Sequence, residues 1–136
     1  MIVKLRRKNS RYPDLTPGQG YVVLGIEADD FRILNNQGRP YLYPSRLFGI
    51  VDPREPEDWI TEYGDDNERY AYPPPLNNCG FFEDFFDGKA DAVATFWQVV
   101  NQRLATAMVT VKVTRESSSF QTEFKNGQES VKLSTT

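Results

Sequence analysis

Histidine is absent from this chain of 136 residues, and cysteine occurs once, at Cys79. The absence of histidine excludes Ser-His-Asp and Cys-His catalysis, histidine-ligated zinc and phosphohistidine transfer. A single cysteine can form neither an internal disulfide nor a thiolate zinc cluster. Because no histidine can activate Cys79, we expect a buried, inert thiol. The remaining general bases need large pKa shifts to act near neutral pH, so we expect no enzymatic activity and no catalytic residues.

Long hydrophobic runs are also absent. No window approaches the roughly 18 apolar residues that cross a bilayer, so we expect no membrane association. The first residues, MIVKLRRKNS, place a short apolar run before the charges, which is the reverse of a signal peptide. Together with the unpaired cysteine, this order predicts a cytoplasmic protein. The glycine-rich segment TPGQG, residues 16–20, lacks the third glycine of a dinucleotide loop, so we expect no cofactor.

Charge is present, and it is unevenly distributed. Residues 1–11 hold five basic side chains and no acid, whereas residues 52–91 hold twelve acids against three basic side chains, a net charge of −9. The acidic segment favours a cationic partner, although acids in loops can also act simply as solvated charges. The basic end is short and lacks interleaved aromatic residues, which argues against nucleic-acid binding.

The first half of the chain carries the pattern of short strands separated by turns. Alternating and β-branched residues predict strands at 2–6, 20–26, 31–34, 40–43 and 49–51. The polar segment 35–38 predicts a hairpin loop in which Gly38 supplies a positive φ. Residues 45–48 predict a single helical turn. Five strands within about fifty residues indicate a small, strongly bent barrel or sheet.

The middle of the chain predicts a hairpin followed by a connector. Residues 58–63 and 69–73 flank a polar turn, with aromatic side chains available for cross-strand packing. The three prolines at 73–75 predict an extended connector, because each ring fixes φ and removes a hydrogen-bond donor.

Helical and then strand patterns occupy the rest of the chain. The aromatic segment 81–86 predicts a short helix that ends at Gly88, and residues 89–104 predict the main helix. The apolar stripe expected on the main helix is Val93, Phe96, Trp97, Val100 and Leu104. Residues 108–114, 119–124 and 129–134 predict a three-stranded C-terminal meander.

Two groups of acids, at residues 62–68 and 83–91, could carry chemistry. Glycosidases use two carboxylates that flank the scissile bond, and oxygen clusters can hold Ca²⁺ or Mg²⁺. Residues 83–88 lack the spacing and the terminal Glu of an EF-hand loop, and both groups lie in polar turns without an obvious desolvating wall. We therefore expect no metal site.

The aromatic residues of the hairpin are the strongest indication of a binding surface. Tyrosine and tryptophan among carboxylates provide rigid contact area at low entropic cost, although ordinary packing accounts for some of them. The candidate partner-binding residues are Glu57, Asp58, Trp59, Glu62, Tyr63, Asp65, Asp66, Glu68, Tyr70 and Tyr72.

Residues 12–52, YPDLTPGQGYVVLGIEADDFRILNNQGRPYLYPSRLFGIVD, carry a pattern of turn and core residues. The residues of the pattern are Leu15, Thr16, Pro17, Gly18, Tyr21, Gly25, Ile26, Glu27, Arg32, Ile33, Gly38, Pro40, Leu42, Tyr43, Pro44, Phe48, Val51 and Asp52. This segment resembles small uncharacterised bacterial proteins with an SH3-like barrel, which are candidate immunity proteins of toxin systems. The Trp59–Tyr72 hairpin and the helix near 89–104 match more loosely, and the last thirty residues match nothing in that pattern. The resemblance implies a fold and no catalytic residues.

We therefore expect one α+β domain spanning residues 1–136. It comprises an SH3-like β-barrel at 1–52, an acidic aromatic hairpin and Pro-rich connector at 53–80, a helical part at 81–105 and a β-meander at 106–136. The leading interpretation is an immunity protein that binds and neutralises a cognate toxin, with a basic toxin domain as its partner. The alternative is an adaptor or subunit that binds a peptide in a barrel groove or at a sheet edge. The third interpretation is a carboxylate-based hydrolase.

Overall fold

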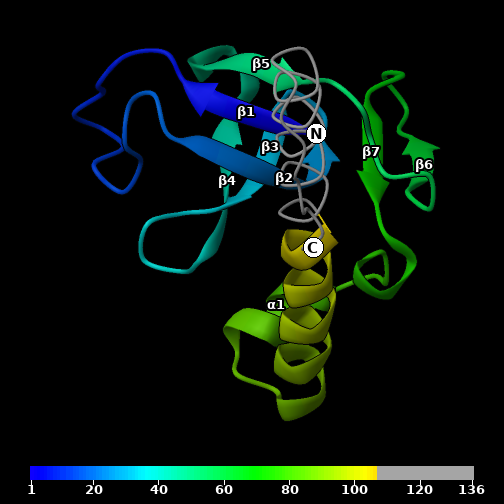
Figure 1. The fold of residues 1–136 in the computed structure, drawn as a ribbon. Helices are drawn as coiled ribbons and strands as arrows, with labels where there is room; N and C mark the ends of the chain where they lie inside the picture. The colour runs from blue at the N-terminus through cyan, green and yellow to red at the C-terminus, as the bar shows by residue number, and fades with distance from the viewer. Residues whose placement is uncertain (107–136) are drawn as a thin grey trace, which may run out of the picture. The chain divides into compact units, whose positions relative to one another are not determined.

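The computed structural model describes residues 1–106, in which an antiparallel sheet is combined with helices (Figure 1). The strands are β1 (Ile2–Leu5), β2 (Gly20–Glu27), β3 (Asp30–Leu34), β4 (Pro40–Pro44), β5 (Phe48–Asp52), β6 (Ile60–Tyr63) and β7 (Arg69–Tyr72). Helix α1 spans Phe81–Phe86, and residues 90–106 are also helical. Residues 1–96 form one compact unit, and a second begins at Trp97. The strands expected at 108–114, 119–124 and 129–134 lie outside the described residues.

Strand β2 is the centre of the sheet. Its residue Ile26 pairs with Phe31 of β3 and with Ala71 of β7, so β3 and β7 lie on opposite edges of β2. The first residues of β2 pair with β1, which in turn pairs with β5. Strand β4 extends the sheet beyond β3, and β6 extends it beyond β7. The α+β class expected from the sequence is therefore confirmed.

Within the described residues, the sheet is not closed into a barrel, which corrects part of the expectation. Strands β4, β5 and β6 each pair with a single neighbour. A 3-10 turn at Ser45–Leu47 joins β4 to β5, which agrees with the single helical turn expected at residues 45–48. Instead of pairing with β4, β5 continues to the opposite edge of the sheet and pairs with β1. The chain thus bends sharply between consecutive strands without joining the two ends of the sheet.

The core of residues 1–96 lies against the sheet and follows from strand alternation. In β1, Val3 and Leu5 are buried while Lys4 between them is exposed. The buried cluster is Val3, Leu5, Leu15, Tyr21, Val23, Ile26, Phe31, Ile33, Tyr43, Phe48 and Ala71. Gly38 has a φ of +75° in the loop between β3 and β4, as its turn position requires.

The proline segment differs from its expectation. Pro73 is extended, but Pro74–Leu76 form a 3-10 turn instead of continuing an extended connector. Proline is compatible with the start of a helical turn because its fixed φ is already helical and the first N–H groups need no helical partner. The turn buries Leu76 and redirects the chain toward α1.

Aromatic side chains of α1 pack on one another and on Phe96. The rings of Phe85 and Phe96 have centroids 4.6 Å apart, and Phe82 contacts Phe96 at 6.1 Å. Along residues 90–106, the buried side chains are Ala92, Phe96, Val99 and Val100. Val93, Trp97 and Leu104, which were expected in the buried stripe, are half-buried. The stripe has the expected helical period, but its centre is rotated toward Ala92 and Val99.

Candidate functional site

The predicted hairpin is formed by β6 and β7, and it projects from one edge of the sheet (Figure 1). Strand β7 attaches it to the sheet through Tyr70 and Ala71, which pair with Glu27 and Ile26 of β2. The turn between β6 and β7 is closed by hydrogen bonds from the Gly64 N–H to the Glu68 carbonyl and from the Asn67 N–H to the Gly64 carbonyl. Strand β6 is therefore the outer strand of this part of the molecule.

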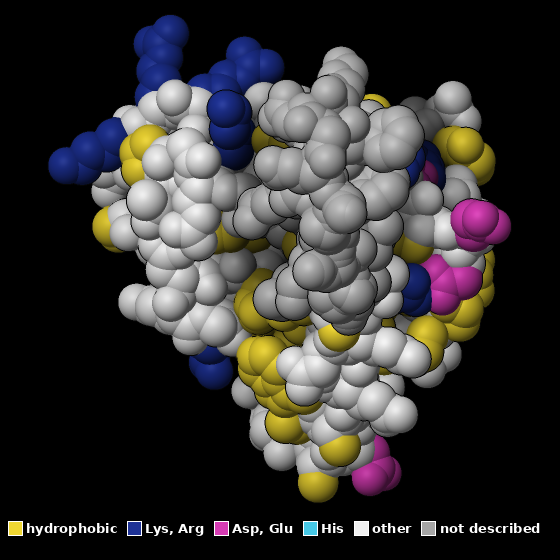
Figure 2. All heavy atoms as spheres, in the orientation of Figure 1, with side chains coloured by type: hydrophobic (Ala, Val, Ile, Leu, Met, Phe, Trp, Pro, Cys, Tyr) yellow, Lys and Arg dark blue, Asp and Glu magenta, His cyan; other side chains and the backbone are white. Residues whose placement is uncertain are grey.

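Six of the ten predicted binding residues are exposed, and they surround β6. Every residue of β6 is exposed, and Tyr63 is 64% exposed. The exposed members of the predicted set are Glu57, Asp58, Glu62, Tyr63, Asp65 and Asp66. Figure 2 shows Asp and Glu side chains over this region, whereas Lys and Arg side chains gather over the N-terminal loop. The uneven charge of the sequence is thus also uneven in space within residues 1–96.

The other four predicted residues are half-buried or buried, and they stabilise the hairpin. Trp59 is half-buried and packs against the core cluster. The Tyr70 hydroxyl donates to Glu68 Oε2 at 3.2 Å, and Glu68 Oε1 accepts the Asp66 N–H at 2.9 Å. A hydrogen bond from the backbone of Glu68 itself, followed by those from Asp66 and Tyr70, holds the pKa of the Glu68 carboxyl below its usual value. Tyr72 is buried, with only 6% of its surface exposed, so it cannot form part of an exposed surface.

Tyr72 instead takes part in a buried polar network that anchors the hairpin. Its hydroxyl donates to Glu27 Oε2 at 2.6 Å and accepts from Arg32 Nε at 2.8 Å. Arg32 is buried as well, and its remaining nitrogens donate to Glu27 Oε2 at 2.7 Å and to the Pro40 carbonyl at 2.9 Å. The guanidinium lies 3.9 Å from the Phe82 ring centroid. Burial raises the pKa of the Tyr72 hydroxyl, so it stays a donor.

A second brace joins the hairpin to the segment before it. Arg69 Nη1 and Nη2 donate to the two carboxylate oxygens of Glu55 at 2.8 and 2.5 Å, and Nη2 also donates to Thr61 Oγ1. These hydrogen bonds lower the pKa of Glu55. The two strands and the segment that leads into β6 are therefore held together on the face that carries Thr61 and Tyr63.

The sequence analysis missed two features of β6 that could contact a partner: the exposed apolar side chain of Ile60 and the backbone of the strand. Ile60 is 40% exposed beside Glu62 on one face of β6, while Tyr63 points to the other face. The predicted acids and aromatics are thus not on one face, since successive side chains of a strand alternate. The signal that could have located the site is the strand itself, because ITEY carries a polar side chain on each face, Glu62 on one and Thr61 on the other, and follows a proline-rich segment.

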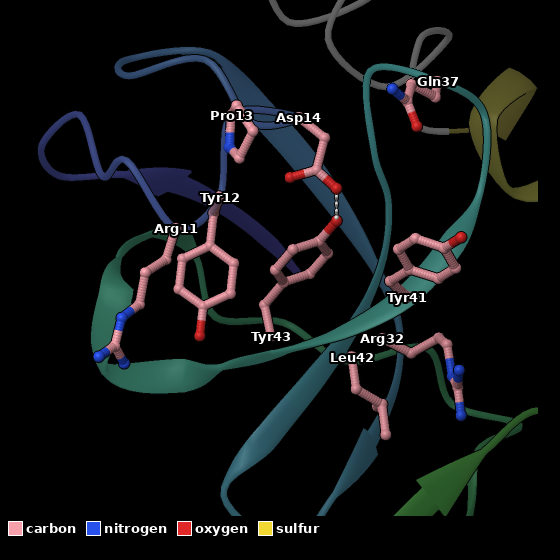
Figure 3. A pocket seen from close by; sticks show the side chains of 9 residues that line it. All are labelled: Arg11, Tyr12, Pro13, Asp14, Arg32, Gln37, Tyr41, Leu42 and Tyr43. Carbon is pink, nitrogen blue, oxygen red and sulfur yellow. Dashed lines mark hydrogen bonds between the residues drawn. The ribbon is translucent and has the colours of Figure 1, made fainter.

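A shallow hollow of about 580 Å³ lies elsewhere in residues 1–96 (Figure 3). Its lining is Arg11, Tyr12, Pro13, Asp14, Arg32, Gln37, Tyr41, Leu42 and Tyr43. Tyr41 and Tyr43 are two residues apart on β4 and therefore share one face of the strand. Tyr12 packs edge-on against Tyr43, with ring centroids 5.6 Å apart. The Tyr43 hydroxyl donates to Asp14 Oδ2 at 2.6 Å, and the same oxygen accepts from Asn35 Nδ2 at 2.9 Å.

The charges of this hollow do not select one kind of ligand. Arg11 and Arg32 line it together with a single acid, Asp14, among the described residues. One oxygen of Asp14 is already occupied by Tyr43 and Asn35, and Arg32 is paired with Glu27. A two-carboxylate mechanism would need a second acid beyond those that line the hollow. Tyr43 has a raised pKa because of its burial and its hydrogen bond to Asp14, so it acts as a structural donor.

Cys79 is exposed, which corrects the expected burial; it lies in the loop before α1, where no strand or helix covers it in the described residues. In residues 1–106, no group of three or more potential metal ligands lies close together. Within the same residues, no helix has the length and apolar character that a membrane span requires.

Comparisons with protein-family models, curated proteins and solved structures find no match to this chain.

Proposed function

We propose that this chain is a cytoplasmic, non-enzymatic protein that binds another protein, and that it acts as an immunity protein against a basic bacterial toxin domain. The observation that carries the proposal is the exposed outer strand β6, whose side chains combine acids with an exposed tyrosine. The resemblance of residues 12–52 to candidate immunity proteins supports the same function. An acidic surface accelerates association with a basic partner and covers its positive charge.

The hydrogen bonds that hold the hairpin in place support a binding role. Association is favoured when the contacting surface is ordered beforehand, because less conformational entropy is lost. Tyr72 and Arg69 fix the hairpin through hydrogen bonds to Glu27 and Glu55 on its two sides. The exposed acids of the hairpin are not needed for folding, since exposed charges contribute less than about 1 kcal/mol each to the free energy of unfolding.

The test begins by identifying the partner through affinity capture from the native cell and mass spectrometry. The captured protein is then produced alone in a bacterial host, where an immunity function predicts that it arrests growth. Co-production of this chain should restore growth. A partner that is harmless when produced alone would contradict the immunity function and favour the adaptor interpretation.

A charge-reversed variant tests the surface itself. Replacing Glu62, Asp65 and Asp66 by lysine should slow association with the captured partner and weaken its salt dependence. Glu68 is left in place because it holds the turn. The matched control reverses three other exposed acids, Glu83, Asp87 and Asp91, which changes the net charge equally. Equal effects of the two variants would assign the association to overall charge and remove the hairpin from the proposal.

The adaptor interpretation has its own observation in the tyrosine-lined hollow. Tyrosine side chains around a shallow groove suit an extended peptide. Replacing Tyr41, which is 39% exposed, by alanine tests it. Loss of the captured partner by Tyr41→Ala, with retention by the hairpin variant, would favour the groove over β6.

A further inference from the structure

We propose that β6 binds its partner by strand addition, pairing its outer edge with a basic strand of the partner that carries alternating lysine or arginine side chains. This inference deepens the proposed function and rests on it. It specifies which backbone groups make the contact and which chemistry the partner strand has. The observation behind it is that β6 is an edge strand exposed at every residue, with acids around it.

The hydrogen bonds of β7 determine which groups of β6 face outward. The Arg69 carbonyl accepts the Ala28 N–H at 2.8 Å, so the polar backbone groups of Arg69 point toward β2 and away from β6. Tyr63, which lies opposite Arg69, is therefore in a non-hydrogen-bonded pair of the hairpin. Because such pairs alternate along an antiparallel ladder, Thr61 is in the same situation opposite Ala71. The N–H and C=O groups of Thr61 and Tyr63 thus face the outer edge.

No strand of the described residues pairs with this outer edge. An exposed edge is a template for another strand, and proteins commonly protect it with charged side chains. Here the protection is selective, because the charged residues within β6 and next to it in the sequence are acids: Glu57 and Asp58 before it, Glu62 within it, and Asp65 and Asp66 after it. The positive charge of Arg69, which contacts Thr61, is already paired with Glu55. A strand that brings positive charge meets no such barrier.

Charge complementarity chooses this occupant over a second copy of the chain. If two copies of β6 paired edge to edge, each would bring its own Glu62 and its flanking acids toward those of the other, and like charges across a strand pair are destabilising. A lysine opposite Glu62 instead forms a favourable cross-strand pair. On the same face, Ile60 offers apolar surface to the stem of that side chain.

The test uses the full chain and a synthetic peptide of alternating lysine and valine residues. In the favoured register, lysines share the face of Glu62, and the valines lie opposite Thr61 and Tyr63. Binding is expected to protect the Thr61 and Tyr63 amides from hydrogen exchange, because these amides gain a backbone acceptor. A peptide with glutamate in place of lysine should not bind. If the lysine peptide fails to bind, or binds without protecting these two amides, the proposal is overturned.

N-methylated peptides separate strand pairing from simple charge attraction. Methylating the valine amides removes the donors that face β6 and should weaken binding at least about tenfold, because two or more hydrogen bonds are lost. Methylating the lysine amides leaves those donors intact and should change the affinity little. Equal effects of the two methylation patterns would show that charge alone holds the peptide, which overturns strand addition.

Variants of the chain make the complementary test. Thr61→Pro removes an outward N–H without removing a hydrogen bond between β6 and β7, so the hairpin can keep its ladder. Thr61→Val is its control, because it also lacks the hydroxyl that Arg69 contacts but retains the N–H. Only the proline variant should fail to bind the lysine peptide. Glu62→Lys should weaken the lysine peptide about two- to fivefold and improve binding of the glutamate peptide.

The captured partner distinguishes failure of this inference from failure of the proposed function. If charge reversal weakens binding of the partner and Thr61→Pro does not, the acidic surface binds the partner without strand addition. In that case this inference alone is wrong. If neither variant changes binding of the partner, the assignment of the hairpin as the binding surface is wrong. Loss of the partner in both variants, with retention in Thr61→Val, supports both.

Discussion

Replacing Gly25 by alanine introduces a methyl group where the Tyr72 ring lies. A Cβ at this position would lie 2.7 Å from Tyr72 Cζ and still closer to the ring carbons Cδ1 and Cε1. The ring cannot give way easily, because its hydroxyl is held by Glu27 and Arg32 and its face packs on Phe82 at 5.4 Å. Gly25→Ala is therefore expected to displace Tyr72 and break the network.

The size of the effect follows from two contributions. Forcing additional volume into a packed interior costs about 1–3 kcal/mol. Displacing the Tyr72 hydroxyl leaves Arg32 Nε, which is buried, without its acceptor, and an unsatisfied buried donor costs about 1–3 kcal/mol. We expect the free energy of unfolding to fall by about 2–6 kcal/mol, a large part of the 5–15 kcal/mol typical of a domain.

The assay is urea unfolding followed by far-ultraviolet circular dichroism, with Gly20→Ala as the matched control. Gly20 lies in the same strand, and its added Cβ would meet nothing closer than Ile2 Cγ2 at 3.6 Å. That control should be neutral or slightly stabilising, because alanine restricts the unfolded chain. In a Tyr72→Ala background, Gly25→Ala should cost less than about 1 kcal/mol, since the clash is gone. Equal stability of the two alanine variants, or additivity of the double variant, would refute this account of Gly25.

Three more predictions concern single side chains. Phe96→Ala should lower the free energy of unfolding by about 3–5 kcal/mol, measured by urea denaturation, because Phe96 is fully buried against Phe82 and Phe85. The raised pKa of Tyr72 predicts stabilisation that is present below its usual pKa of about 10 and is lost as pH rises beyond it; alkaline unfolding should therefore depend less on pH in Tyr72→Phe, and an unchanged profile would contradict the role of its burial. The lowered pKa of Glu55 has the opposite sign: Glu55→Gln should cost less than about 1 kcal/mol at neutral pH, and its difference from the unmodified chain should vanish in acid as Glu55 becomes protonated.

The local elements of the fold could be predicted from the sequence because their signals are local. Alternation in IVKL, turn residues around Gly38 and the paired runs around residues 64–68 each determine a strand or a hairpin within a few residues. The positive φ of Gly88 likewise agrees with the expected end of α1. In each of these segments, the turn chemistry and the hydrophobic period point to the same structure.

The closure of the sheet and the burial of individual side chains could not be predicted, because they depend on distant segments. In RYAY, Tyr70 and Tyr72 share one face by alternation, and both flank Ala71. Only Tyr72 is buried, because Arg32 from β3 and Phe82 from α1 meet above it. The exposure of Cys79 has the same character, since it depends on which elements cover a loop.

The buried network connects the two halves of the functional proposal. Gly25, Glu27 and Arg32 belong to the pattern of residues 12–52, yet what they hold in place is Tyr72 of the hairpin. Gly25 leaves room for the ring, while Glu27 and Arg32 fix its hydroxyl from two sides. A binding strand gains affinity when it is held in one orientation before the partner arrives. Within the proposed function, these three pattern residues would therefore position β6 for its partner without touching the partner themselves.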